Sequence, residues 1–261
     1  MISIICHRQW MKRGAILLFW LLVWQLVAVV MDNSIILVTP FEVGKRAVLL
    51  LKTKEFYQVI AYSCVRIFYG LLGAWLLGGL LGAISYKVQW LKELIAPIIH
   101  LMKTVPVASF VILALIWIGS EKLTFFIVFV ISMPIVYQGV ITGLMETPKQ
   151  LLEVAKVFRF SFWKKFWYLY RPTCIPFLIN SAVITVGLAW KSGIAAEVIG
   201  MPEHSIGERL YMAKISLETG DLFAWTAMII LCSYLFEKAF LFLLYRIAGN
   251  SYEARKEKKT I

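Results

Sequence analysis

The sequence is short of charged residues. Asp, Glu, Lys and Arg make up 16% of its 261 residues, whereas a soluble domain usually has about 25%. Hydrophobic residues make up 61% of the chain, and the mean hydropathy is +0.79. This balance excludes an ordinary soluble globular protein and indicates a polytopic membrane protein.

Cysteine and histidine are also scarce, and they are widely spaced. No C-x-x-C pattern or mixed Cys/His ligand spacing occurs among them, so no metal site and no disulfide are predicted. The cysteines are expected to be small buried hydrophobes in a reduced setting. The residues concerned are Cys6, Cys64, Cys174, Cys232, His7, His100 and His204.

Motifs for covalent chemistry are missing as well. The chain has no G-x-x-x-x-G-K-[ST] loop, so ATP must be bound by another chain. It has no G-x-S-x-G, no H-E-x-x-H and no paired acidic motif. A membrane-embedded enzyme would need a catalytic polar cluster, and none is found. The chain is therefore not expected to be an enzyme or to bind a cofactor itself.

Six long apolar runs are present instead, each close to the ~20 residues that a helix needs to cross a bilayer. The first lacks a small-residue cleavage site and is interpreted as an uncleaved span. The fold class predicted is an all-α, polytopic membrane protein, with one transmembrane permease domain over residues 1–261. The expected spans are residues 15–31, 62–84, 95–118, 123–144, 175–199 and 222–247.

The net charge of +12 does not predict nucleic-acid binding, because the basic residues cluster at span ends and no base-reading motif occurs. Sixteen Lys and Arg residues fall on the side of both termini, against seven on the other side. Because Lys and Arg near span ends are retained inside, both termini are expected to be cytoplasmic in a plasma-membrane protein.

Three further segments carry local predictions. Thr39-Pro40 begins an amphipathic helix that could lie on the membrane surface. The glycine-rich second span is expected to pack closely against another helix. The third span contains Pro97 and Pro106, which break the backbone ladder and need neighbouring protein to satisfy the freed carbonyls.

The loop over residues 146–172 is the most patterned polar segment, with six cations and two carboxylates. Pro148 can begin a helix, and apolar residues then recur at helical spacing up to Phe158. A second short helix, Arg159 to Lys165, is expected to end where Pro172 breaks it. A cytoplasmic helix–turn–helix between two spans is a shape suited to docking a soluble partner.

The segment EVAKVFRFSFWKKFWYLYRPTCIP resembles the "EAA" loop of importer-type ABC transporter permeases. Glu153, Val154 and Ala155 occupy the opening positions, Arg159 stands at the usual glycine, and Arg171-Pro172 replaces Leu-Pro. The segments SCVRIFYGLLGAWLLGGLLG, KTVPVASFVILALIWIG and GLAWKSGIAAEVIG are similar to matching parts of the nitrate/sulfonate/taurine branch. Together these resemblances cover roughly residues 60–210.

The resemblance implies a transport subunit that dimerises with a second permease, in a homodimer, and docks two copies of a cytoplasmic ABC ATPase. ATP and Mg would be bound by that ATPase, and an extracytoplasmic solute-binding protein would deliver the substrate. It also implies that the residues that couple to the ATPase are Glu153, Ala155, Phe158, Arg159 and Phe160.

Two features of the loop depart from the family pattern. A glycine at position 159 would allow a positive φ, which Arg159 adopts only at a cost. Either the turn is built differently or Arg159 makes a compensating partner contact. The loop is also rich in aromatic residues: Phe158 and Phe160 are expected at the partner, and the segment 167–170 at the headgroups.

Ionisable residues inside spans are candidates for the translocation pathway, because a charge at mid-bilayer is costly unless paired or wet. Lys191 either faces the pathway and attracts an anion or pairs with another helix. Glu197 lies ~9 Å from Lys191 along the helix and ~120° from it around the helix axis. For Glu197 an outer-gate or helix-capping role is favoured over contact with the substrate. Trp190 could line the path, although packing is the better interpretation, and Lys103 is expected to snorkel inward or contact the coupling loop.

The function predicted is the transmembrane subunit of an ATP-driven importer for a small, anionic solute. The branch includes carriers of nitrate, sulfonates, taurine and thiamine-precursor pyrimidines, and specificity resides mostly in the binding protein. The alternative is a membrane scaffold that recruits a cytoplasmic partner without transport.

Overall fold

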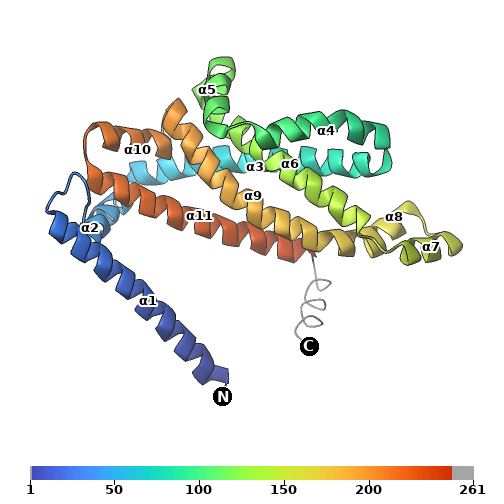
Figure 1. The fold of residues 1–261 in the computed structure, drawn as a ribbon, viewed down its shortest axis with the longest axis horizontal. Helices are drawn as coiled ribbons and strands as arrows, with labels where there is room; N and C mark the ends of the chain where they lie inside the picture. Colours follow the sequence, from blue (N-terminus) through green and yellow to red (C-terminus); the bar gives the residue numbers. More distant parts are fainter. Residues whose placement is uncertain (1, 249–261) are drawn as a thin grey trace.

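The computed structural model describes residues 2–248, and every regular element in that part of the chain is helical, which confirms the all-α fold (Figure 1). The basic residues after position 248, counted above with the termini, lie outside the described residues. In chain order the elements are α1 (Ile2–Met31), α2 (Pro40–Leu51), α3 (Lys54–Lys87), α4 (Gln89–Thr104), α5 (Val107–Ile118), α6 (Ser120–Met145), α7 (Lys149–Val157), α8 (Phe162–Lys165), a π-helical turn η1 (Phe166–Tyr170), α9 (Arg171–Gly200), α10 (Ile206–Ile215) and α11 (Thr219–Ala248).

Five helical segments are long and apolar enough to cross a membrane, and a sixth crossing is formed if a bent pair counts as one. The five segments are Gly14–Met31, Lys54–Lys87, Ser120–Met145, Phe162–Gly200 and Thr219–Arg246. Helix α3 begins eight residues before the expected start of the second span and continues to Lys87. The structure therefore has the expected pattern of spans, with helices that extend beyond several of the apolar runs.

The expected third span over 95–118 is interrupted, as the two prolines in it allow. Helices α4 and α5 meet at Val105-Pro106 with an angle of 108° between them. Val105 is extended, with ψ 127°, as is usual for a residue before proline because the proline ring crowds the helical conformation. Pro97, in contrast, stays inside α4. The chain thus turns sharply within the membrane-crossing segment, and this turn is called the elbow below.

Small residues explain the close packing of α3 on α6. A Cβ atom at Gly78 would lie 2.8 Å from the Met133 carbonyl oxygen, and one at Gly82 would lie 2.9 Å from the Tyr137 carbonyl oxygen. Ala74, one turn before Gly78, is fully buried. Small residues at intervals of four let helix backbones approach where lipid supplies no hydrophobic drive for association. The packing role expected for these glycines is therefore present.

Helix α6 packs on α9 by the same means. Gly139 and Gly143 form a G-x-x-x-G pair on α6, and a Cβ at Gly143 would lie 2.9 Å from the Cα of Cys174 on α9. A Cβ at Gly139 would overlap the Ser181 hydroxyl. Helices α3, α6 and α9 therefore form one tightly packed three-helix core.

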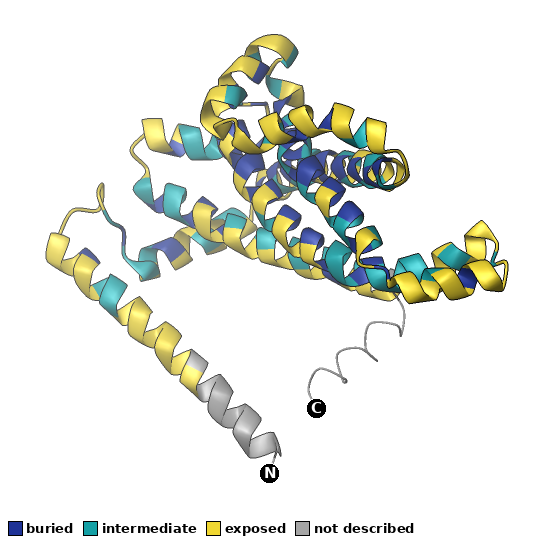
Figure 2. Ribbon diagram, turned by 45° about the vertical axis from the view of Figure 1, so that its right-hand side comes forward, coloured by how far each residue is buried: buried dark blue, intermediate teal, exposed yellow. Residues whose placement is uncertain are grey.

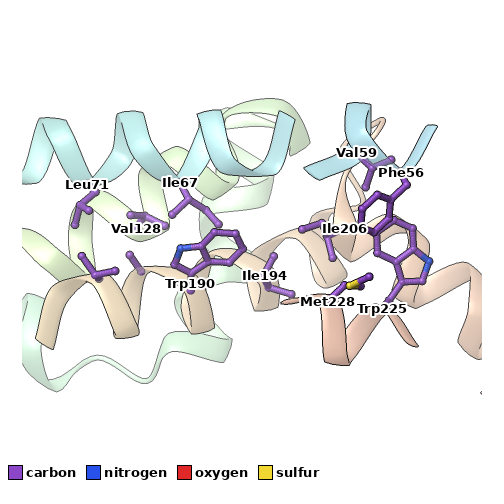
Figure 3. Close-up of a cluster of buried hydrophobic side chains, with 12 residues drawn as sticks. Phe56, Val59, Ile67, Leu71, Val128, Trp190, Ile194, Ile206, Trp225 and Met228 are labelled. Carbon is purple, nitrogen blue, oxygen red and sulfur yellow. The ribbon is translucent and has the colours of Figure 1, made fainter. Parts of the chain in front are cut away.

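Two ends of the molecule can be distinguished in Figure 1. The hairpin end carries α7 and α8, which project beyond α6 and α9. The α10 end carries α10, α2 and the first turns of α3 and α11. A buried cluster that includes Phe56, Trp190 and Trp225 runs between the α3, α9 and α11 helices toward the α10 end (Figure 3).

Helix α1 stands away from this body. Figure 2 shows its described part as exposed along most of its length, and only Ala28 in its span is buried. The ring of Trp24 contacts Phe223 of α11, with 5.8 Å between ring centroids. The apolar surface of α1 is therefore available to lipid or to another chain.

Candidate functional site

The loop between α6 and α9 forms a helical hairpin of α7 and α8 that projects from the body (Figure 1). Its tip exposes large apolar side chains: Val157 is 79% exposed and Phe158 is 70% exposed. Ala155 on the opposite face of α7 is buried. A short helix with one buried face and one exposed apolar face is suited to contact a partner rather than water.

The turn between α7 and α8 is closed by backbone hydrogen bonds. The Phe160 N–H donates to the Ala155 carbonyl at 2.9 Å, and the Arg159 N–H donates to the Lys156 carbonyl at 3.0 Å. This six-to-one bond with a left-handed residue inside it is a Schellman motif. Arg159 has φ +49°, so it adopts the conformation that a glycine would adopt. The turn is therefore not built differently: the arginine accepts the strained backbone.

The helix that follows the turn does not end at Pro172, which corrects the prediction of a separate second helix. Helix α8, η1 and α9 form one continuous helical segment from Phe162 to Gly200. The π-helical turn over 166–170 lies directly before Arg171-Pro172, and its wider hydrogen-bond spacing accommodates the missing N–H and the ring of Pro172. The hairpin is therefore a direct extension of a membrane-crossing helix.

Aromatic and cationic contacts hold the second arm of the hairpin against the end of α3. The Lys87 ammonium lies over the Phe162 ring, 4.3 Å from its centroid. The rings of Tyr86 and Tyr170 are 6.2 Å apart. A cation over an aromatic face is an attractive contact. The hairpin is thus tied to α3 as well as to α6 and α9.

The five residues expected to couple to a partner occupy different positions on the hairpin. Glu153, Phe158 and Arg159 are exposed, Phe160 is partly buried and Ala155 is buried. The hairpin therefore offers three of the five side chains directly to a partner, while the small Ala155 sits where a larger side chain would not fit.

Lys191 lies on a face of α9 that no other helix within residues 2–248 covers. The exposed positions 180, 184, 188, 191, 195 and 199 recur every three or four residues along that helix, so they lie on one side of it. The lysine makes no ion pair or hydrogen bond within residues 2–248. The structure thus leaves Lys191 uncovered, in the middle of an apolar stripe.

Trp190 points the other way, into the buried cluster. It is 1% exposed and lies against Ile67 of α3 (Figure 3). Its ring also contacts Phe236 of α11 at 5.8 Å. This burial favours the packing interpretation over a position on the pathway. Lys103 is exposed at the end of α4, and no hydrogen bond or ion pair joins it to the hairpin in the part of the chain that the structure describes.

Glu197 is completely buried at the α10 end and caps a helix. Its Oε2 atom accepts hydrogen bonds from the Ser63 hydroxyl at 2.8 Å and from the Gly207 N–H at 3.3 Å. The same hydroxyl accepts a bond from the Ile206 N–H at 3.0 Å. A carboxylate at the first turn of a helix satisfies free N–H groups and interacts favourably with the helix dipole. The helix-capping interpretation therefore describes this geometry.

A second polar layer lies at the surface beside Glu197. Arg66 pairs with Glu121 of α6, with 2.5 Å between Nη2 and Oε2, and also donates to the Glu203 carbonyl at 3.2 Å. The Glu203 N–H donates to the other oxygen of Glu121 at 3.2 Å. These partners are 55 or more residues apart in the sequence. Sequence reasoning missed Ser63 and Glu121, since their spacing carries no local signal.

Comparison with known proteins agrees with this architecture. The family model described as "Binding-protein-dependent transport system inner membrane component" matches residues 74–250. The taurine transport system permease protein of Escherichia coli (strain K12) is 24% identical over 69% of this chain and 66% of its own length. The bicarbonate transport system permease protein of Synechocystis sp. is 27% identical over 55% of this chain and 51% of its own length.

The nitrate import permease protein of Synechocystis sp. is 25% identical over 54% of this chain and 52% of its own length. The chain thus matches between half and two thirds of the length of these three relatives. The family match includes the α3–α6–α9 core from Ala74 onward, the hairpin and α10. This chain therefore belongs to the family of binding-protein-dependent transport system inner membrane components, the multi-pass permeases of ABC transporters.

Proposed function

We propose that this chain is the membrane subunit of an ATP-driven importer and that the α7–α8 hairpin is its contact with the ATPase. One observation carries the proposal. The hairpin joins two helices of the packed core, and its tip exposes Val157 and Phe158. Burial of two such side chains in a partner pocket is worth about 3–6 kcal/mol before the costs of association, so a partner has a clear reason to bind here.

The proposed complex contains two copies of a cytoplasmic ABC ATPase and a second permease, a homodimer being the simplest arrangement. ATP and Mg are held by the ATPase. In this arrangement the hairpin end is cytoplasmic, in agreement with its excess of Lys and Arg over carboxylates. Both termini are then cytoplasmic, and a binding protein approaches the α10 end.

We further propose a small anion as the substrate. The three relatives described above are named as permeases for taurine, bicarbonate and nitrate, each of which carries an anionic group. Lys191 is a cation on an uncovered face of a membrane-crossing helix, where facing lipid would be costly. A water-filled pathway between two permeases would relieve that cost and place the ammonium beside the passing anion.

Copurification tests the contact at the hairpin. Phe158→Ser should abolish coelution of the ATPase with the permease, whereas Phe41→Ser should leave it intact. Phe41 is a suitable control because it is 81% exposed but lies on α2, at the α10 end (Figure 1). Normal ATPase binding by the Phe158 variant would contradict the proposed contact. Coelution without any ATP-dependent uptake by the wild-type complex would instead favour the scaffold function.

Uptake measurements test the pathway lysine. Lys191→Met should abolish uptake while assembly and basal ATP hydrolysis persist, and Lys191→Arg, which keeps the cation, should retain much of the uptake. Wild-type uptake by the Met variant would show that the ammonium does not act on the substrate.

A further inference from the structure

Two polar layers hold the connection between α9 and α10, and both depend on the position of α10. In the buried layer, Glu197 on α9 caps the first turn of α10 through the Gly207 N–H. In the surface layer, Arg66 on α3 holds the Glu203 carbonyl. Glu203 lies in the short connection that leads into α10, and Gly207 is the second residue of α10. A displacement of α10 would therefore break both contacts together.

Each of the two layers leaves one buried polar atom without a partner. Glu197 Oε1 and Arg66 Nη1 are both buried, and neither has a hydrogen-bond partner within residues 2–248. Ser63 and Arg66 are three residues apart on α3, so Arg66 follows about one turn after the serine that binds Glu197, on the same side of the helix. The ion pair that Arg66 forms is with Glu121. One layer thus has an unsatisfied acceptor and the other an unsatisfied donor.

Gly207 shows how tightly α10 is pressed against α9. A Cβ atom at this position would overlap the backbone and Cβ of Glu197 and the backbone nitrogen of Val198. No side chain fits at this position unless α10 moves away. The first turn of α10 therefore sits directly on the last turns of α9, the helix that carries Lys191.

Helix α10 also offers a surface to a partner at that end of the molecule. Met212 is 49% exposed, Ile215 is 60% exposed and Leu217, just after the helix, is 65% exposed. Such apolar residues beside polar ones are typical of a protein contact. A protein that docks there would act on α10, the helix whose Gly207 N–H is bonded to Glu197.

We infer that Glu197 is a positioning residue that switches partners. With α10 packed on the end of α9, Glu197 caps α10. When a binding protein displaces α10, Glu197 pairs with Arg66, which has lost its Glu203 contact, and α9 shifts with its lysine face. This inference rests on the proposed importer function. It supplies the two discrete arrangements that coupling between an outer docking surface and the pathway requires.

The test uses the whole permease–ATPase complex in nanodiscs and measures ATP hydrolysis with and without the binding protein. Gly207→Ala should displace α10 from the end of α9 and raise the rate of ATP hydrolysis in the absence of the binding protein. The expected rise is about fivefold or more, which is the lower end of the coupling factors between linked sites. Gly220→Ala is the matched control. Gly220 is likewise the second residue of its helix, and its added Cβ would make only an ordinary contact, 3.5 Å from Arg46 Cγ.

Glu121→Gln is the second variant, should the Gly207 variant fail to fold. The Glu121 side chain is 58% exposed, and its loss frees Arg66 for Glu197, so hydrolysis without the binding protein should rise in this variant also. Asp221→Asn, which breaks the separate Arg46–Asp221 pair, should leave the rate unchanged. Adding Arg66→Gln to the Gly207 variant should remove the rise, which a merely structural role of Glu197 would not predict.

Amide exchange in the isolated permease gives an independent readout. The Ile206 N–H is bonded to Ser63 when α10 is packed on the end of α9. It should exchange faster in the Glu121 variant than in the Asp221 variant. Unchanged hydrolysis and unchanged exchange in Glu121→Gln would overturn the switch. A wild-type permease that supports no hydrolysis by any ATPase, but whose amide exchange changes as expected, would overturn the proposed function and leave the switch as a local property of the fold.

Discussion

Replacing Gly78 by alanine tests the close packing on which the three-helix core depends. The added Cβ would lie 2.8 Å from the Met133 carbonyl oxygen and 3.3 Å from the Tyr137 backbone nitrogen. Carbon–oxygen contacts between packed helices are usually about 3.3–3.6 Å, so α3 and α6 would have to separate by about 0.5–0.8 Å. Overpacking of this kind costs about 1–3 kcal/mol, because backbone atoms cannot move aside as a flexible side chain can.

The neighbouring Gly79 supplies the control for this variant. A Cβ at Gly79 meets nothing within 4 Å, while both substitutions gain the same helix propensity of up to about 1 kcal/mol. The difference between the two alanine variants therefore isolates the packing cost. Unfolding of the purified chain in mixed micelles, followed by helical ellipticity, should show Gly78→Ala less stable than Gly79→Ala by about 1–3 kcal/mol. Equal stabilities would refute the close approach of α3 and α6.

Three further predictions follow from the geometry. Arg159→Gly should stabilise the hairpin turn by about 0.5–1 kcal/mol. This is the left-handed backbone strain that the glycine relieves, minus the conformational entropy that it adds to the unfolded chain. The exchange of the Phe160 N–H should become about two- to fivefold slower. Trp190→Ala should cost about 3–5 kcal/mol of stability. Trp190→Phe should cost under about 1.5 kcal/mol and keep uptake, because the indole N–H has no partner among the described residues, and lost uptake in the folded Phe variant would point to the pathway. Ser63→Ala should cost about 1–3 kcal/mol in thermal or denaturant unfolding, since its hydroxyl serves two bonds. Ser85→Ala should stay within about 0.5 kcal/mol, since that buried hydroxyl makes no hydrogen bond within residues 2–248.

The number of membrane-crossing helices could be predicted because it depends on the length and hydropathy of continuous segments. The shape of the third crossing could not. Pro97 and Pro106 look alike in the sequence, yet only Pro106 marks the elbow. Whether a proline bends or breaks a helix depends on what surrounds the freed carbonyl, and that is decided by helices distant in the sequence.

The hairpin shows the same division between local and distant information. The left-handed residue at position 159 could be anticipated, because the turn chemistry is local and the position matches a usual glycine. The continuity of the helix through Pro172 could not, because it depends on the π-helical turn before it. A proline near a helix start and a proline that breaks a helix have the same sequence signature.

The surroundings of Glu197 were the least predictable part of the candidate site. Its depth in an apolar segment marked it as costly and therefore interesting. Its hydrogen-bond partner on α3, Ser63, lies 134 residues earlier in the chain, and the N–H that it caps lies ten residues later. Only the folded chain brings a serine, a carboxylate and a helix start together.

Helices α6 and α9 are joined at both ends, and this determines how motion can pass along the molecule. At the hairpin end they are connected through α7 and α8, one arm of which is continuous with α9. At the α10 end, Glu121 at the start of α6 binds the Glu203 N–H just after α9. Between these ends, Gly139 and Gly143 hold the two helices in backbone contact. A close-packed pair tied at both ends moves as a rigid unit, because packed interfaces are bistable rather than continuously deformable. If the hairpin binds the ATPase as proposed, we therefore expect a displacement of the hairpin to reach the Glu121–Glu203 contact, and a displacement of α10 to reach the hairpin in return, as reciprocal coupling requires.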